Sequence, residues 1–437
     1  MPHLKPAALA AAFLIAVSSA ALAETATGYV VLDVKDGTVL AQKNAERPFI
    51  PASVLKMPTA LAVLDTLGAD HRFTTRVVHT GIVSNGVLEG DIVLVGGGDP
   101  MLDTPALEGM AKALAAAGVT RVTGRFLYDD SAVLHRDAIE ARQPADASYN
   151  PGLAGLSLDF NRFKVRWNEG SPTGAEVPLD PLPVALTMPP EQSEVWVPVR
   201  EPGRFTARMF HWLAAKQSIT LPLPEPGPAP AEASELVRNE SLPVAEILRR
   251  ALIHSNNMTT DTVLIAAAQK ALGRTVRLEE AGEWLAARTK EALPSQPWTG
   301  LVTPNGSGLS DAARMTPAQC AATARRAGQD AATRAILPPL QLEPFGVADG
   351  RAKTDTPLRA KTGTIFYARA LAGTVKTKSG RDVAFCILTD DHVQRALYDA
   401  VPFDKRRDEV VHLPAREWLR AAREIEKTTV LGWLEAL

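Results

Sequence analysis

Three short motifs combine hydroxyl and amine side chains at spacings that suit acyl transfer. They are Ser53-Val-Leu-Lys56, Ser255-Asn-Asn257 and Lys361-Thr-Gly363. Residues three apart on a helix share a face, so the Lys56 amine can reach the Ser53 hydroxyl and take its proton. Taken alone, Ser-x-x-Lys is most often a helix cap followed by a surface lysine. The order and local setting of all three motifs together indicate an activated serine nucleophile.

Lys56 can act as a base near neutral pH only if its surroundings lower its pKa. A free lysine has a pKa of about 10.4 and is already protonated near neutrality. Burial and a second nearby cation lower such a pKa, and we expect Lys361 to supply that cation to Lys56. Ser255 then suits a proton relay to the leaving amine, and Asn257 suits a hydrogen bond to a substrate amide.

The third motif has the residue types of a peptide-binding strand. Lys361 and Thr362 suit a terminal carboxylate, and the absence of a side chain at Gly363 lets an extended peptide lie against the strand edge. We expect the backbone N–H groups of Ser53 and Thr364 to form an oxyanion hole. The motifs therefore predict a serine enzyme that acts on a peptide with a free carboxyl end.

Sequence periodicity assigns an element to each motif. A helix is predicted to begin at or just before Ser53 and to end at Gly68, and two more are expected over Leu242–Ile253 and Asp261–Leu272. The Asp36-Gly37 turn predicts a hairpin between two strands, near residues 28–34 and 38–41. Near the end, the predicted strands are 358–365, 368–376 and 382–389, followed by an amphipathic helix around 415–425 and a short apolar tail.

A whole domain is predicted between the first two motifs. The gap from Lys56 to Ser255 is far longer than a connection between helices needs. Short strands and glycine-rich turns fill it from about His71, and the proline-rich segment Leu221–Pro230 suggests a stiff domain connection. We therefore expect a catalytic domain of residues 24–68 and 241–437, split by an inserted mixed α/β domain of residues 69–240.

The three motifs, in this order and with this insert, resemble those of the D-alanyl-D-alanine carboxypeptidase/endopeptidase family, the type-four penicillin-binding proteins. The resemblance implies an α/β (α+β) fold with a β-lactamase/transpeptidase-like sheet flanked by helices. It implies that Ser53 is acylated, that Lys56 is its base, and that Ser255, Asn257, Lys361 and Thr362 complete the pocket. Peptidoglycan stem peptides would be the substrates and β-lactam antibiotics covalent inhibitors. Further stretches that resemble family segments are 72–76, 90–100, 305–310 and 360–364.

Two positions differ from the family pattern, which usually has Asp where this chain has Asn256 and Asn305. Neither change removes a reacting group.

A β-lactamase is an alternative function for this chain, but no convincing Glu-x-x-x-Asn deacylation motif lies between 258 and 360. A catalytically idle scaffold that binds the cell wall is another. Ser307 lies between two glycines but lacks the spacing of a nucleophile elbow, so we expect a structural loop there.

Composition limits the remaining possibilities. The 437 residues carry a net charge of −2, which argues against a general affinity for nucleic acid. Residues 1–23 have the pattern of a cleaved signal peptide, which predicts a protein that is periplasmic or otherwise exported, soluble after cleavage and with at most peripheral membrane contact. No metal or cofactor is expected. The two cysteines, Cys320 and Cys386, could form a disulfide or remain buried thiols.

Overall fold

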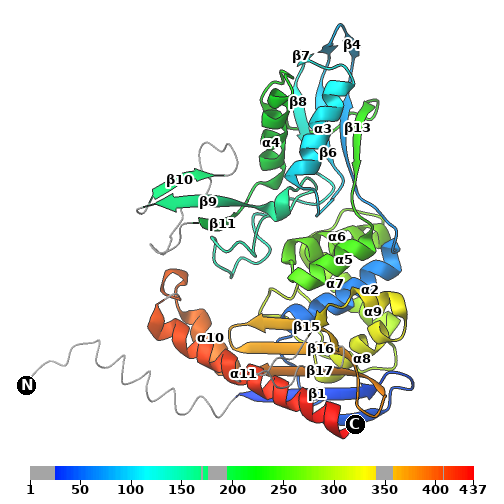
Figure 1. Ribbon diagram of the computed structural model, residues 1–437, viewed down its shortest axis with the longest axis vertical. Helices are drawn as coiled ribbons and strands as arrows, with labels where there is room; N and C mark the ends of the chain where they lie inside the picture. Colours follow the sequence, from blue (N-terminus) through cyan, green and yellow to red (C-terminus); the bar gives the residue numbers. More distant parts are fainter. Residues whose placement is uncertain (1–24, 169–170, 176–193, 341–357, 407) are drawn as a thin grey trace, which may run out of the picture. The chain divides into compact units, whose positions relative to one another are not determined.

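The computed structural model describes residues 25–168, 171–175, 194–340, 358–406 and 408–437 (Figure 1). The predicted signal peptide lies outside these residues. The chain forms two compact units. The first comprises the described residues up to Met57 together with those of 290–303 and 311–437, and the second comprises those of 58–289 and 304–310.

An antiparallel sheet forms the centre of the first unit, with the strand order β14-β15-β16-β17-β1-β2 (Figure 1). Tight turns connect β1 to β2 and β15 to β16 to β17, which confirms the predicted hairpin and meander. The last three strands begin and end within one residue of their predicted limits. The strands are β1 (Ala26–Asp33), β2 (Val39–Lys43), β14 (Pro339–Leu340), β15 (Leu358–Ile365), β16 (Ala368–Lys376) and β17 (Asp382–Asp390).

Helices cover both faces of this sheet. Helix α8 (Pro317–Gly328) packs against β17, β1 and β16, while α11 (Glu409–Ala436) packs against β16. The predicted apolar tail belongs to α11, which is longer than expected at both ends. Its Trp433 ring lies 5.1 Å from that of Tyr29, so the apolar side chains cover the sheet. The shorter helices of this unit are η1 (Ala52–Leu55), α9 (Ala331–Ile336), α10 (His392–Ala400) and η3 (Phe403–Lys405).

A disulfide between Cys320 and Cys386 joins α8 to β17. Both cysteines are fully buried. The sequence left open whether they pair, and the structure shows that they do. Side chains alternate along a strand. Cys386 therefore faces α8, and its neighbours Phe385 and Ile387 face the apolar cluster that includes Val430 and Leu434 of α11.

Removal of this disulfide should measurably destabilise the protein. The cysteines are 66 residues apart in sequence, so the cross-link restricts the unfolded chain strongly. For a Cys320→Ala/Cys386→Ala variant we expect a loss of about 2–4 kcal/mol in the free energy of unfolding. Urea unfolding checks this value. An unchanged midpoint for the variant would contradict the prediction.

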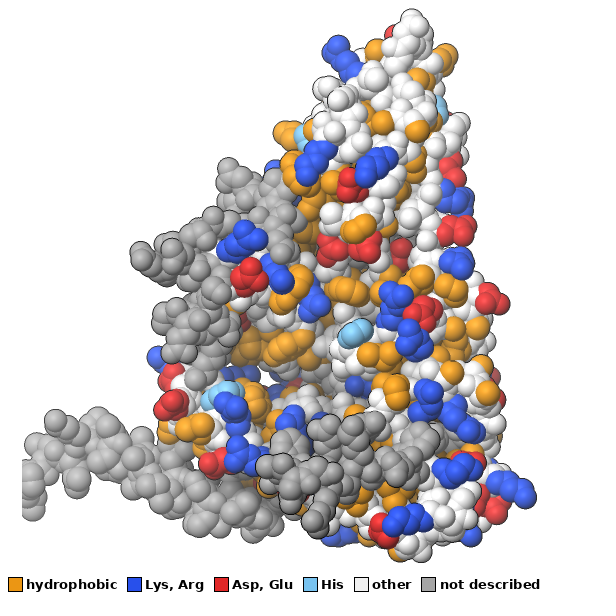
Figure 2. Space-filling view, viewed as in Figure 1, with side chains coloured by type: hydrophobic (Ala, Val, Ile, Leu, Met, Phe, Trp, Pro, Cys, Tyr) orange, Lys and Arg blue, Asp and Glu red, His pale blue; other side chains and the backbone are white. Residues whose placement is uncertain are grey.

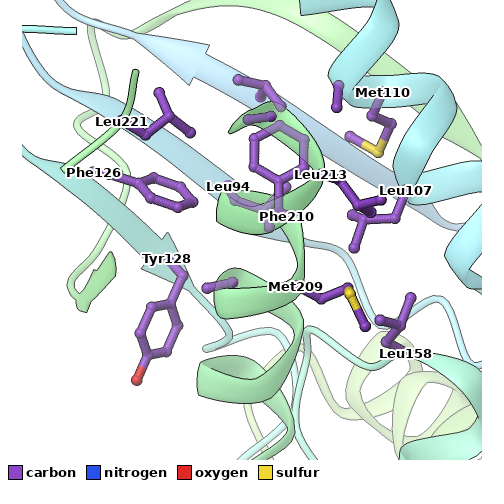
Figure 3. Close-up of a cluster of buried hydrophobic side chains, with 14 of the residues drawn as sticks. Leu94, Leu107, Met110, Phe126, Tyr128, Leu158, Met209, Phe210, Leu213 and Leu221 are labelled. Carbon is purple, nitrogen blue, oxygen red and sulfur yellow. The ribbon is translucent and has the colours of Figure 1, made fainter. Parts of the chain in front are cut away.

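The second unit is built around a mixed sheet with the strand order β12-β8-β6-β3-β13. Helices α3 and α4 pack on it, and Figure 3 shows Phe126 of the sheet beside Phe210 of α4 in their shared core. These elements are β3 (Thr74–His79), β6 (Ile92–Gly96), α3 (Thr104–Ala116), β8 (Phe126–Asp129), α4 (Pro202–Lys216), β12 (Pro224–Pro226) and β13 (Ser234–Glu240). Two small sheets comprise β4 (Ile82–Ser84), β5 (Val87–Glu89) and β7 (Arg121–Val122), and β9 (Arg162–Asn168), β10 (Ser171–Ala175) and β11 (Glu194–Pro198).

The proline-rich segment is not a free connection between domains. Its residues Pro224–Pro226 form β12, which pairs in parallel with β8. Proline cannot donate a backbone hydrogen bond, so it is tolerated on an edge strand such as this one. The prediction of a stiff linker was therefore wrong, because an extended proline-rich segment can equally complete the edge of a sheet.

Four helices and a short turn contribute to another part of the second unit. They are α2 (Lys56–Leu67), η2 (Asp159–Asn161), α5 (Val244–His254), α6 (Asn257–Leu272) and α7 (Leu278–Ala292). Helix α5 packs against α6. Apolar side chains of α2, η2, α6 and α7 share a cluster with Val133, Ile139 and Leu153 from the predicted insert. This packing explains why the compact units differ from the predicted domain limits. The assignment of 24–68 and 241–437 to one catalytic domain remains a prediction.

Charged side chains of both signs are intermixed on the face drawn in Figure 2, in keeping with the small net charge. Within the described ranges, no helix is both long and apolar enough to cross a bilayer.

Candidate active site

Ser53 lies in the short 3-10 helix η1, directly before α2. The preceding residue, Ala52, has a φ of 47°, a left-handed conformation that is uncommon for a residue with a side chain. Such strained backbone occurs often at functional sites, where the surrounding fold holds it in place. Buried Val54 and Leu55 anchor η1 in the core. The fold therefore holds Ser53 at a sharp bend.

Lys56, at the start of α2, is directed at the nucleophile. Its Nζ donates a hydrogen bond to Ser53 Oγ at 3.1 Å, and the lysine is completely buried. The two side chains come from one turn of continuous helical backbone, so their spacing in sequence sets their geometry. This contact confirms the predicted pairing of Ser53 with Lys56.

Strand β15 contacts η1 at Gly363. A Cβ atom at this position would lie 2.8 Å from Pro51 O and 3.0 Å from Ser53 N, which is too close. Only glycine therefore allows the strand to pass this near the nucleophile. The sequence alone explains Gly363 by the space that a substrate peptide needs at the strand edge. The structure adds a second reason for glycine at this position, which is close packing against the bend that holds Ser53.

Lys361 lies two residues before Gly363 and so projects from the same face of β15, the face that η1 contacts. It is 2% exposed, and its Nζ donates to the carbonyl of Thr362 at 2.7 Å. Burial, assisted by the positive charge of Arg369, lowers the pKa of Lys361 to about 8. The structure thus brings a second amine to this side of the sheet.

This pKa predicts a falling limb in the pH dependence of acylation. Lys361 is a cation below its pKa and loses its charge above it, so any step that needs the cation slows tenfold per pH unit above about 8. The rate of labelling by a fluorescent penicillin between pH 6 and 10 measures this limb. A Lys361→Arg variant stays charged, so the limb should disappear from its profile whatever its absolute rate. Persistence of the limb in that variant would show that another group titrates.

Part of the outer edge of β15 has no paired strand among the residues that the structure describes. Strand β14 pairs with Leu358 and Arg359, and Ala360 N donates to Pro338 O. In the part of the chain that the structure describes, no strand pairs with this edge beyond Ala360. Thr362 is half-buried and Thr364 exposed. An extended peptide could therefore add to the sheet here by backbone hydrogen bonds.

One pair of residues beside this strand was missed at the sequence level. Arg369 of β16 and Glu426 of α11 form a buried ion pair, with Nη2 and Oε1 2.7 Å apart. Arg369 also donates to Thr364 Oγ1 at 2.7 Å. The predicted turn between 365 and 368 already places residue 369 opposite residue 364, and that register was the available signal.

The second motif lies in the second unit, at the junction of α5 and α6. Ser255 ends α5 with a φ of 52°. Asn256 caps α6, because its side chain accepts a hydrogen bond from Thr259 N at 2.9 Å. Asn257 Nδ2 donates to Tyr149 O at 2.9 Å. Asparagine and aspartate are equally good N-caps, which explains how Asn256 can stand where the family has Asp. The roles of Ser255 and Asn257 in catalysis remain predictions.

The Gly-Ser-Gly segment is a well-bonded loop of the second unit. Asp261 Oδ1 accepts hydrogen bonds from Gly306 N at 2.8 Å and Ser307 N at 2.9 Å, and Asn305 Oδ1 accepts one from Gly308 N at 2.9 Å. Ser307 is fully buried. These contacts agree with the prediction of a structural loop. They also give Asn305 a turn-forming role that needs only a side-chain acceptor.

The family of the chain follows from its sequence match. The model of the D-Ala-D-Ala carboxypeptidase 3 (S13) family matches residues 14–188 and 182–407, which is most of the chain. The chain therefore belongs to this family, and it is a serine-type D-Ala-D-Ala carboxypeptidase. The match confirms the resemblance that the three motifs suggested.

Relatives in sequence and in structure are similar to this chain over most of its length. A D-alanyl-D-alanine carboxypeptidase from Actinomadura sp. is 27% identical, over 85% of this chain and 79% of the relative. The crystal structure of penicillin binding protein 4 from Haemophilus influenzae superposes with a TM-score of 0.74 at 17% identity, covering 94% of this chain and 99% of that one. The same protein complexed with a β-lactam gives 0.68 at 17% identity, covering 86% and 93%. These structures confirm the predicted fold class.

Proposed function

We propose that this enzyme is exported and cleaves the D-Ala-D-Ala bond of peptidoglycan stem peptides through an acyl-Ser53 intermediate. The observation that carries the proposal is the 3.1 Å contact between Lys56 Nζ and Ser53 Oγ, beside the strand that bears Lys361. A buried amine in contact with a serine hydroxyl is the arrangement that general-base activation of the nucleophile requires.

The reaction proceeds in two steps. Lys56, in its neutral form, takes the proton of Ser53 as the oxygen attacks the carbonyl of the penultimate D-alanine. The tetrahedral intermediate then collapses, its C–N bond breaks, and the terminal D-alanine leaves after its nitrogen receives a proton. Water hydrolyses the acyl-enzyme and restores Ser53. By the family motif, we assign Ser255 to proton relay and Asn257 to the substrate amide.

The substrate carboxylate is assigned to the third motif. Lys361 contributes positive charge while it is protonated, and Thr362 and Thr364 contribute hydroxyl groups on an accessible strand edge. The backbone N–H groups of Ser53 and Thr364 are assigned to the oxyanion hole. A peptide that adds to the β15 edge would run past Ser53, because Gly363 packs against the bend that holds it.

β-Lactams should acylate the same serine. The complex of the Haemophilus influenzae protein with a β-lactam supports this assignment. We further propose that the same site hydrolyses peptide cross-links, which would make the enzyme an endopeptidase as well. If residues 1–23 direct export, they should be cleaved off after Ala23, and the N-terminal sequence of the mature protein tests that part.

Mass spectrometry of products from a purified disaccharide pentapeptide tests the main proposal. We expect loss of one alanine residue from the peptide and its release as D-alanine. Nitrocefin should give a stoichiometric burst, because no deacylating motif of the β-lactamase type was found in the sequence. Sustained nitrocefin turnover without release of D-alanine would instead support a β-lactamase. A folded protein with neither activity would support a scaffold role.

A further inference from the structure

Arg369 lies beside the motif strand, although no motif contains it. It is the direct cross-strand partner of Thr364 in the pairing of β15 with β16. Directly opposed residues on neighbouring strands project from the same face of a sheet. Helix α11 packs on β16 (Figure 1). This helix carries Glu426, whose carboxylate forms the ion pair with Arg369.

The guanidinium group of Arg369 is already occupied by protein partners. Nε donates to Glu426 Oε2 at 2.8 Å and Nη2 donates to Glu426 Oε1 at 2.7 Å, so the ion pair is bidentate. Nη1 donates to Thr364 Oγ1 at 2.7 Å. The Arg369 and Glu426 side chains are only 10% and 6% exposed. The planar, doubly held guanidinium therefore presents Nη1 to Thr364 in a fixed direction.

This contact decides what Thr364 can offer a ligand. A hydroxyl group has one proton and two lone pairs, whereas arginine can only donate. Thr364 Oγ1 must therefore accept from Arg369, which leaves the threonine proton available to a different partner. Thr364 is exposed at the strand edge, so that partner can come from outside the protein. A carboxylate, which only accepts hydrogen bonds, is the complementary group.

We propose that the Arg369–Glu426 ion pair fixes the Thr364 hydroxyl as a hydrogen-bond donor to the terminal carboxylate of the substrate. This inference rests on the proposed function, because that function supplies the carboxylate. Arg369 does not touch the substrate and is a positioning residue. The pair thereby contributes to the preference for a free carboxyl end over a blocked one.

The test compares two peptides that differ only at the carboxyl end, diacetyl-L-Lys-D-Ala-D-Ala and its C-terminal carboxamide. The variant Arg369→Met/Glu426→Met removes both charges, which is often nearly neutral for stability, whereas removal of one would leave the other buried and uncompensated. We expect kcat/KM for the free acid to fall about 10- to 100-fold, the range for a hydrogen bond to a charged group. The value for the carboxamide should change less than twofold.

Three further variants connect the effect to the Thr364 hydroxyl. Thr364→Val should reproduce the loss, and Thr364→Ser should keep the preference. Thr364→Val in the Arg369→Met/Glu426→Met background should cause no further loss, since the donor it removes is no longer aligned. Arg416→Met is the matched control, because Arg416 is an exposed arginine on the same helix, ten residues before Glu426 in sequence.

Specific outcomes would overturn the inference. Equal losses for both peptides would show that the ion pair only maintains structure, and no loss would show that it has no role. If the double variant does not fold, the exposed Thr364→Val variant decides, because unchanged discrimination there also overturns the proposal. Failure of the native enzyme to release D-alanine from the free acid and D-alaninamide from the carboxamide would contradict the proposed function itself, a result distinct from those above.

Discussion

Replacing Ser53 with alanine is expected to abolish covalent labelling by a fluorescent penicillin and to lower D-alanine release at least 10⁴-fold. The reason is that the acyl-enzyme forms on Ser53 Oγ, the atom that Lys56 Nζ approaches to 3.1 Å. Removal of a nucleophile eliminates the covalent route and leaves only what binding and the oxyanion hole contribute. Gel fluorescence and a chromatographic assay of D-alanine give the two readouts.

A matched control separates this effect from general damage. Ser84 is an exposed serine on β4, and Ser84→Ala should label and hydrolyse as the native enzyme does. Intact protein mass after treatment with penicillin should increase by one antibiotic molecule in the control and stay unchanged in Ser53→Ala. Covalent labelling of Ser53→Ala at the native rate would place the nucleophile elsewhere and remove the basis of the assignment.

Local patterns predicted much of the catalytic region. The meander of β15, β16 and β17 was anticipated within one residue at each limit, because alternation and tight turns are local properties. The contact between Lys56 and Ser53 was also predictable, since both lie within one helical turn. In each case a few neighbouring residues determine the geometry.

Features that depend on distant parts of the chain were harder to predict. The role of Glu426 could not be inferred, because it depends on where α11 packs on the sheet. The proline-rich segment was misassigned for the same reason, since its pairing with β8 is a contact between residues about one hundred positions apart. The cysteine pairing likewise required the packing of α8 on β17.

The structural reasons for Gly363 and Asn256 also appeared only with the fold. The sequence identified both positions, but it did not show that a side chain at 363 would collide with Pro51 and Ser53. Nor did it show that Asn256 is a helix cap. Motif spacing thus located the reacting groups, whereas packing explained why residue 363 is a glycine and residue 256 is an asparagine.

Replacing Lys56 should separate acylation from binding. Methionine has a similar length and no amine, so Lys56→Met should lower the acylation rate constant about 10²- to 10⁴-fold, the usual contribution of a general base. Arginine keeps a donor and a charge but cannot lose its proton, so Lys56→Arg should lose a similar factor. Stopped-flow labelling at several penicillin concentrations gives the rate constant and the preceding binding constant separately.

The comparison of the two variants identifies the role of the lysine. If Lys56 acts as a base, both variants acylate slowly at every pH, while the preceding binding constant changes only a few-fold. If Lys56 acts only as a buried cation, Lys56→Arg should retain most of the native rate, and that result would contradict base catalysis. Lys43→Met, at an exposed position on β2, should match the native enzyme, and near-ultraviolet circular dichroism should confirm that each variant keeps its tertiary packing. Because Lys56 is completely buried in contact with Ser53, the loss should fall on the chemical step.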